Sequence, residues 1–256
     1  MAFSPEYRTY TRASAATTAA VLDEGLRAYM LRVYNWMTSG LLLTGIVSWA
    51  IAHTSLIDAF YPVVQTQFGG LARHPSPLAM ISIFAPLAFV LVLSMGVNRL
   101  SKTAAQTLYW VFCAAMGASL TNIFMVYTGD SIVRVFFITA ATFAGMSIFG
   151  YTTKADLSRF GSFLFMGLIG IIVAGLVNMF MHSSALQFAI SVIGVLVFTG
   201  LTAYDTQRIK ATYVQYAYAD GVDGAAKRSV YDALSLYLNF INLFMMLLRI
   251  MGNRSN

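Results

Sequence analysis

Charged side chains are scarce in this chain. Its 256 residues include 16 Lys or Arg and 10 Asp or Glu, which is 10% of the total, whereas a soluble domain carries about 25%. So few charges cannot cover a water-facing surface, and the mean hydropathy is +0.70. These values exclude a soluble globular protein and indicate a chain surrounded by lipid.

Cysteine and histidine are also rare. Cys113 is the single cysteine, so an intrachain disulfide framework is excluded. The three histidines, His53, His74 and His182, are not spaced as metal ligands. We therefore expect no zinc site, no redox scaffold and no cofactor.

Long apolar stretches make up most of the chain. Each is close to the ~20 residues needed to cross a hydrocarbon core. They predict an all-α membrane protein, a bundle of seven transmembrane helices over residues 34–256, with sizeable gaps only at 54–77 and 205–231. The stretches cover about residues 34–53, 78–97, 104–127, 132–150, 162–181, 185–204 and 232–251.

The first 33 residues are polar or weakly apolar. A secretory signal needs an apolar run near its start, and here that run begins only after Arg32. We expect residues 1–33 to remain as a short cytoplasmic arm.

Lys and Arg are distributed unevenly between alternate connections. Twelve fall in the N-terminal arm and the connections predicted to share its side, and four fall on the opposite side. The positive-inside rule then places the N-terminus in the cytoplasm and the C-terminus outside. The net charge of +6 thus reports topology, and nucleic acid is not an expected partner.

Acidic residues within spans are candidates for function because they are costly there. Only Asp205 and Asp232 touch a predicted span boundary. Asp205 follows an apolar run and is expected at the cytoplasmic end of the sixth helix. It is either a functional carboxylate or an interfacial acid paired with Arg208 one turn later.

The seventh predicted span carries a polar stripe on one face. The stripe either lines a hydrated path or supplies hydrogen bonds between packed helices. Its outermost member, Arg249, is expected to extend to the membrane surface. The stripe recurs at steps of three and four, at Asp232, Ser235, Asn239, Asn242, Met246 and Arg249.

Several membrane chemistries can be excluded. A retinal Schiff base needs a lysine, and residues 232–251 contain none. An aspartyl protease needs two intramembrane aspartates, and a serine protease needs a histidine within a span. The Asp220–Gly224 run lacks the ligand spacing of an EF-hand. No enzyme activity is expected.

Motifs in four spans resemble those of the Bax inhibitor-1 family, in its bacterial branch. The most specific are VFTGLTAYDTQ at 197–207 and YLNFINLF at 237–244, followed by LLRI at 247–250. YNWM at 34–37, with Gly40 and Gly45, is similar to the first motif of the family, and residues 140–151 are similar to its fourth-span motif. The resemblance covers nearly the whole chain after residue 30.

This resemblance implies a seven-helix fold with a central last helix and a passive, pH-sensitive calcium leak. In the family, one aspartate on each of the last two helices forms a proton-sensing gate. Asp205 matches the first aspartate, but Asn239 stands at the position of the second. The family's arginine partners are also missing, since residues 78–97 hold no charge.

The change to asparagine alters what the gate can do. Two close carboxylates titrate as a coupled unit, whereas an amide does not titrate and can donate a hydrogen bond to Asp205. We therefore expect a weakened or single-site pH response, with calcium as permeant ion and a transient calcium contact at Asp205. The predicted gate or ion path comprises Asp205, Asn239, Asn242, Thr202 and Arg208.

An alternative needs no hydrated path. The bundle would then be a regulator of the bacterial inner membrane that binds a quality-control protease or another membrane protein. The arm and the 205–231 segment, with Tyr213, Tyr216 and Tyr218, would supply its contacts.

Overall fold

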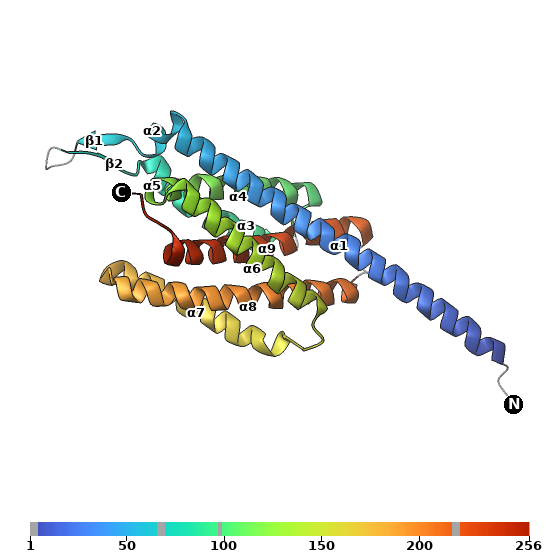
Figure 1. The fold of residues 1–256 in the computed structure, drawn as a ribbon. Helices are drawn as coiled ribbons and strands as arrows, with labels where there is room; N and C mark the ends of the chain where they lie inside the picture. The colour runs from blue at the N-terminus through green and yellow to red at the C-terminus, as the bar shows by residue number, and fades with distance from the viewer. Residues whose placement is uncertain (1–4, 66–69, 97–98, 217–220, 256) are drawn as a thin grey trace.

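The computed structural model describes residues 5–65, 70–96, 99–216 and 221–255. Long helices dominate it, connected mostly by short turns (Figure 1). In chain order the elements are α1 (Pro5–His53), α2 (Leu56–Phe60), β1 (Val63–Gln65), β2 (Leu71–Arg73), α3 (Pro77–Gly96), α4 (Lys102–Leu120), α5 (Ile123–Val126), α6 (Gly129–Thr152), α7 (Ser158–Met181), α8 (Ser184–Tyr216) and α9 (Gly221–Met251).

Within the described residues, six helical segments are long and apolar enough to cross a membrane. They are α3, α4 with α5, α6, α7, α8 and α9, and they coincide with six of the predicted stretches. The seventh stretch, residues 34–53, lies in α1 and is not among the six, because polar residues such as Asn35 dilute its apolar run. The chain is thus an almost entirely helical membrane protein with six candidate spans.

Helix α1 is continuous over 49 residues, which corresponds to about 73 Å. Figure 1 shows its N-terminal part extending beyond the other helices. From residue 22 onward, where burial is described, the first buried side chains of α1 are Leu26, Tyr29, Met30 and Val33. The predicted arm and the first predicted span are therefore parts of one helix, and their division at residue 33 stays a prediction.

The 54–77 connection departs from an all-α fold. Strands β1 and β2 pair antiparallel, with Val63 opposite Arg73. Arg73 donates to the backbone oxygen of Tyr61 at 2.8 Å and forms an ion pair with Asp58 at 2.8 Å. Val63 and Val64 are β-branched, which favours a short strand that hydropathy counting does not detect.

The predicted gap at 205–231 is wrong as a loop. Helix α8 continues to Tyr216, and α9 begins at Gly221. Residues 205–216 contain neither Gly nor Pro, so the helix persists after its apolar run ends. Asp205 consequently lies inside a helix and not at its end, and Tyr218 lies outside the described residues.

Helix α9 is the most enclosed of the candidate spans. In the most apolar 18 residues of α9, 56% of residues are buried, against 11% in the corresponding part of α7. It packs on α1, α4, α6 and α8, while α3 packs mainly on α4 and α7 on α8. The core therefore surrounds α9.

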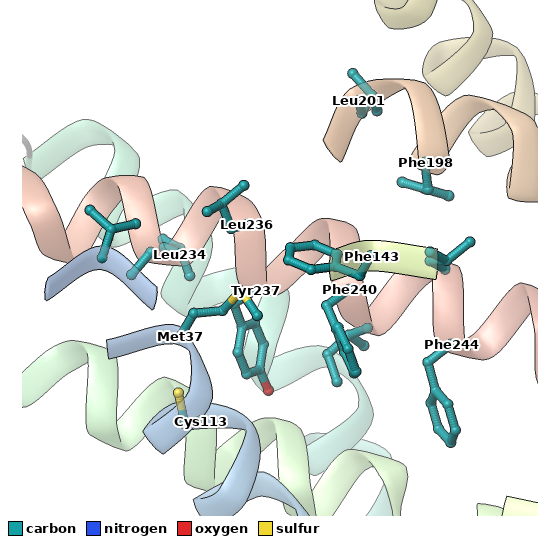
Figure 2. Packing of buried hydrophobic residues seen from close by; sticks show 14 of the residues in the cluster. Met37, Cys113, Phe143, Phe198, Leu201, Leu234, Leu236, Tyr237, Phe240 and Phe244 are labelled. Atoms are coloured by element: carbon teal, nitrogen blue, oxygen red, sulfur yellow. The ribbon is translucent and has the colours of Figure 1, made fainter. Parts of the chain in front are cut away.

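Aromatic side chains of α9 fill this core (Figure 2). Phe240 meets Phe143 of α6 edge to face, with ring centres 5.5 Å apart. Tyr237, three residues earlier on α9, points toward α1 and α4, where its ring contacts Phe112 at 5.4 Å. Its hydroxyl shares a hydrogen bond of 2.6 Å with Thr44. This packing fixes the rotation of α9, and with it the direction of the polar stripe.

Candidate functional site

The site forms around Asp205, a carboxylate buried between α8 and α9. Its side chain is 5% exposed. Ser235 Oγ and Asn239 Nδ2 both donate to its Oδ2, each at 2.8 Å. Ser235 and Asn239 are one turn apart on α9, so one face of that helix supplies both donors. Hydrogen bonds to a carboxylate stabilise its charged form, which compensates in part for its burial.

Arg208 closes the other side of this carboxylate. Its Nη2 lies 3.0 Å from Asp205 Oδ1, one helical turn along α8, and 3.2 Å from Ser235 Oγ. Its side chain is 41% exposed, so the cluster ranges from a buried carboxylate to a partly exposed guanidinium. The guanidinium attracts Oδ1 by charge without an aligned hydrogen bond.

Three of the five residues predicted for the gate thus come together. These are Asp205, Arg208 and Asn239, and the hydrogen bond from the Asn239 amide is present as the residue types suggested. Thr202 is buried, but its hydroxyl donates to the backbone oxygen of Phe198 at 2.8 Å. Asn242 donates to the backbone oxygen of Leu238 at 2.9 Å. Both residues satisfy their own helices and do not join the cluster.

Sequence reasoning left Ser235 out of the site, although it lies on the polar stripe. The spacing contained the signal, because Ser235 and Asn239 are four residues apart and face the same neighbour. Ser235 bridges Asp205 and Arg208, and it is the smallest member of the cluster.

A second polar contact lies further along α9 and also went unpredicted. Tyr29 of α1 donates to Asp232 Oδ2 at 2.6 Å. Tyr34, one turn later on α1, shares a hydrogen bond of 3.3 Å with Thr206. No periodicity within α8 or α9 reveals that α1 supplies these partners, because the contacts join residues 172 or more positions apart.

The cluster contains few groups that could hold a metal ion. Among the described residues, no three His, Cys, Asp or Glu side chains gather as a metal site. Calcium takes about six to eight oxygen ligands, whereas Asp205, Ser235 and Asn239 offer few side-chain oxygens and Arg208 adds a positive charge. These side chains therefore do not provide the ligand set of a resident calcium ion. These features define an integral helical membrane protein with a buried carboxylate cluster between its last two helices.

Comparison with known proteins identifies the family. Residues 26–256 match the family described as "Inhibitor of apoptosis-promoting Bax1", which is the Bax inhibitor-1 family. The matched region begins at Leu26, which is a buried residue of α1.

Individual bacterial relatives agree with this match. The chain is 46% identical over 230 residues to the inner membrane protein YbhL of Escherichia coli K12, covering 90% of this chain and 93% of that protein. It is 45% identical over 247 residues to protein RP147 of Rickettsia prowazekii, covering 96% and 98%. It is also 46% identical over 248 residues to a protein of Caulobacter vibrioides, covering 96% of each. The chain belongs to the Bax inhibitor-1 family.

Proposed function

We propose that this protein is a calcium leak channel of the bacterial inner membrane, gated at the cluster of Asp205, Arg208, Ser235 and Asn239. The observation that carries the proposal is the buried Asp205 carboxylate, which joins α8 to α9 through two hydrogen bonds. Burying a carboxylate within a candidate span is energetically costly, and ionisable residues kept there commonly mark a functional site. The polar groups around this carboxylate come from two adjacent helices.

Arg208 acts as the closing element in this proposal. Its guanidinium occupies the side of Asp205 on which a cation would otherwise bind. A divalent cation reaches the carboxylate only when that ion pair opens. Because Arg208 is partly exposed, its guanidinium can move into water when the pair opens, while the buried Asp205 carboxylate then needs the cation as its new partner.

Seven membrane passages belong to the same proposal, with residues 34–53 of α1 as the first. Two features support this passage. Thr44 of α1 donates to the backbone oxygen of Cys113 in the middle of α4, so α1 runs beside a candidate span. Figure 1 also shows α1 beginning at one end of the bundle and α9 ending at the other. Together with the charge bias, this arrangement supports an N-terminus in the cytoplasm and a C-terminus outside.

Calcium entry into proteoliposomes loaded with an indicator tests the channel. The purified protein is expected to admit calcium faster than empty vesicles, and Asp205→Ala is expected to abolish most of that entry. Asp130→Ala, which removes an exposed carboxylate at the start of α6, is the matched control and should behave as wild type. Wild-type protein that admits no more calcium than empty vesicles, or equal entry in both variants, would overturn the proposal.

Alkaline phosphatase fusions test the seventh passage. A fusion to the C-terminus should be active, because the enzyme folds only outside the cytoplasm, and a fusion after Asp156 should be inactive. An inactive C-terminal fusion would contradict the assigned topology.

A second candidate is a regulator that binds a membrane protease or another membrane protein. One observation favours it: α1 and α8 continue as packed helices beyond the predicted membrane stretches. The tilted rings of Tyr29 and Tyr213 pack together there with their centres 4.9 Å apart. Crosslinking and pull-down from native membranes test it, using full-length protein and a deletion of residues 1–20 that precedes this contact. A stoichiometric partner lost on deletion supports the regulator, and equal recovery of background proteins from both chains counts against it.

A further inference from the structure

A deep apolar groove runs between α1 and α6 on the side of the bundle. Its volume is about 1250 Å³, and it is lined by residues of these two helices and by Phe240 of α9. Both α1 and α6 pack on α9, so the groove is a slot whose floor is the central helix. Within a bilayer such a slot must be filled, because unfilled space forfeits the dispersion contacts of its walls.

The dimensions of the groove suit hydrocarbon chains. Its lining on α1 extends from Arg27 to Trp49, a length of about 33 Å, close to the ~30 Å thickness of the hydrocarbon core. Spread over that length, the volume gives a cross-section of roughly 38 Å². Extended acyl chains, which need only a narrow channel, fit this slot.

One end of the groove is basic and polar. Arg27 lines it there and is exposed, together with the half-buried Tyr34 and Tyr151. Lys210 of α8 reaches the same end, where its Nζ donates to the backbone oxygen of Tyr151 at 3.0 Å and lies 5.0 Å from the centre of its ring. Two cations and two phenols at the end of an apolar slot complement an anionic headgroup.

We infer that this groove binds a diacyl lipid with an anionic headgroup, its chains along Phe240 and its headgroup at Arg27 and Lys210. The inference does not depend on ion conduction. Such a bound lipid differs from lipid in general contact with the bilayer, because the groove reaches Phe240 of α9. Phe240 directly follows Asn239, which belongs to the polar cluster. A bound lipid would therefore touch the helix that carries the candidate gate.

Native mass spectrometry of detergent-purified protein tests the inference. The protein is incubated with equal amounts of phosphatidylglycerol and phosphatidylethanolamine with the same acyl chains. Wild type should retain one phosphatidylglycerol preferentially. Gly45→Phe fills the slot, since a Cβ at Gly45 meets no atom within 4 Å, and should lower retention at least tenfold. Gly170→Phe on the lipid-facing side of α7 is an equally open glycine outside the groove and should retain lipid as wild type does.

Arg27→Gln tests the headgroup separately and places no demand on folding, because Arg27 is exposed. One basic residue near a membrane surface is worth about fivefold in affinity for an anionic lipid, so the preference should fall by about that factor. Arg32→Gln, also exposed on α1 but outside the groove lining, should keep it.

Several results would overturn the inference. One is that Gly45→Phe retains as much lipid as wild type, or that Gly170→Phe loses as much lipid as Gly45→Phe does. Another is that wild type retains phosphatidylglycerol and phosphatidylethanolamine equally, or that Arg27→Gln keeps the full preference for phosphatidylglycerol. A protein dimer that Gly45→Phe abolishes would also overturn it, since a second copy would then be the occupant.

Discussion

Asn239 on α9 donates a hydrogen bond of 2.8 Å from its amide to Asp205 Oδ2 on α8. Both side chains are buried, so the bond joins the last two helices within the core. Asp205 thus faces a neutral amide donor, where an aspartate at position 239 would bring a second carboxylate.

Restoring a second carboxylate tests this relationship. Asn239→Asp should make calcium entry into proteoliposomes depend more steeply on pH, because two buried carboxylates at this distance retain one proton between them. Asn242→Asp is the control, since Asn242 bonds to its own helix and is only half-buried. A wild-type pH profile in Asn239→Asp would end the proposed role of this position.

Removal of the closing cation should increase resting flux. Arg208→Gln takes away the charge 3.0 Å from Asp205 Oδ1, and calcium entry should rise by about fivefold or more, because one partner of this ion pair is buried and the pair is worth at least as much as an exposed one. Arg159→Gln removes an exposed arginine of α7 and should leave entry unchanged. Reduced entry in Arg208→Gln would show that the arginine does not close the path.

Gly150 sets the distance between α6 and α8. A Cβ at this position would collide with the backbone of Ala203, lying 2.9 Å from its Cα. Gly150→Ala should lower the free energy of unfolding by about 1–3 kcal/mol, because backbone cannot move aside as a side chain can. Gly145→Ala on the same helix meets no atom within 4 Å and should be neutral or stabilising. Thermal unfolding in detergent compares them, and equal melting temperatures would refute the close approach.

Two tyrosine hydroxyls on α9 should differ in their contribution to the free energy of unfolding. Tyr237 is fully buried and shares a 2.6 Å hydrogen bond with Thr44, so Tyr237→Phe should cost about 1 kcal/mol of stability. The buried hydroxyl of Tyr231 has no hydrogen-bond partner among the described residues, so Tyr231→Phe should cost nothing. Denaturant unfolding of both variants measures this, and an equal loss in the two would contradict the assignment.

Much of the membrane architecture could be predicted from the sequence, because apolar length is set by bilayer thickness. The predicted stretches at 162–181 and 185–204 lie within α7 and α8. Helix ends outside the apolar runs were not predictable in this way, since α8 continues for twelve residues past Tyr204 on helix-compatible polar residues. The β1–β2 hairpin was missed because each strand is only three residues long.

The candidate site was partly predictable, for a similar reason. The step of four residues from Ser235 to Asn239 is local information, and it correctly places both on the face toward Asp205. That Thr202 and Asn242 bond to their own helices depends on rotamers and on neighbouring helices, which a periodic pattern does not contain. The partnership of Tyr29 with Asp232 depends on how α1 crosses α9 and needs the tertiary structure.

The shallow attachment of α7 has a consequence for how this protein tolerates change. Helix α7 packs mainly on α8, and only 11% of its apolar segment is buried. Most of its side chains therefore need only be apolar enough to face lipid. Phe, Leu, Ile, Val and Met should replace one another on its outer face with little effect on stability, whereas the same substitutions on α9 would disturb a packed core. Sequence drift between homologous chains should therefore accumulate on α7, and a small apolar label that must leave the fold undisturbed is best placed there.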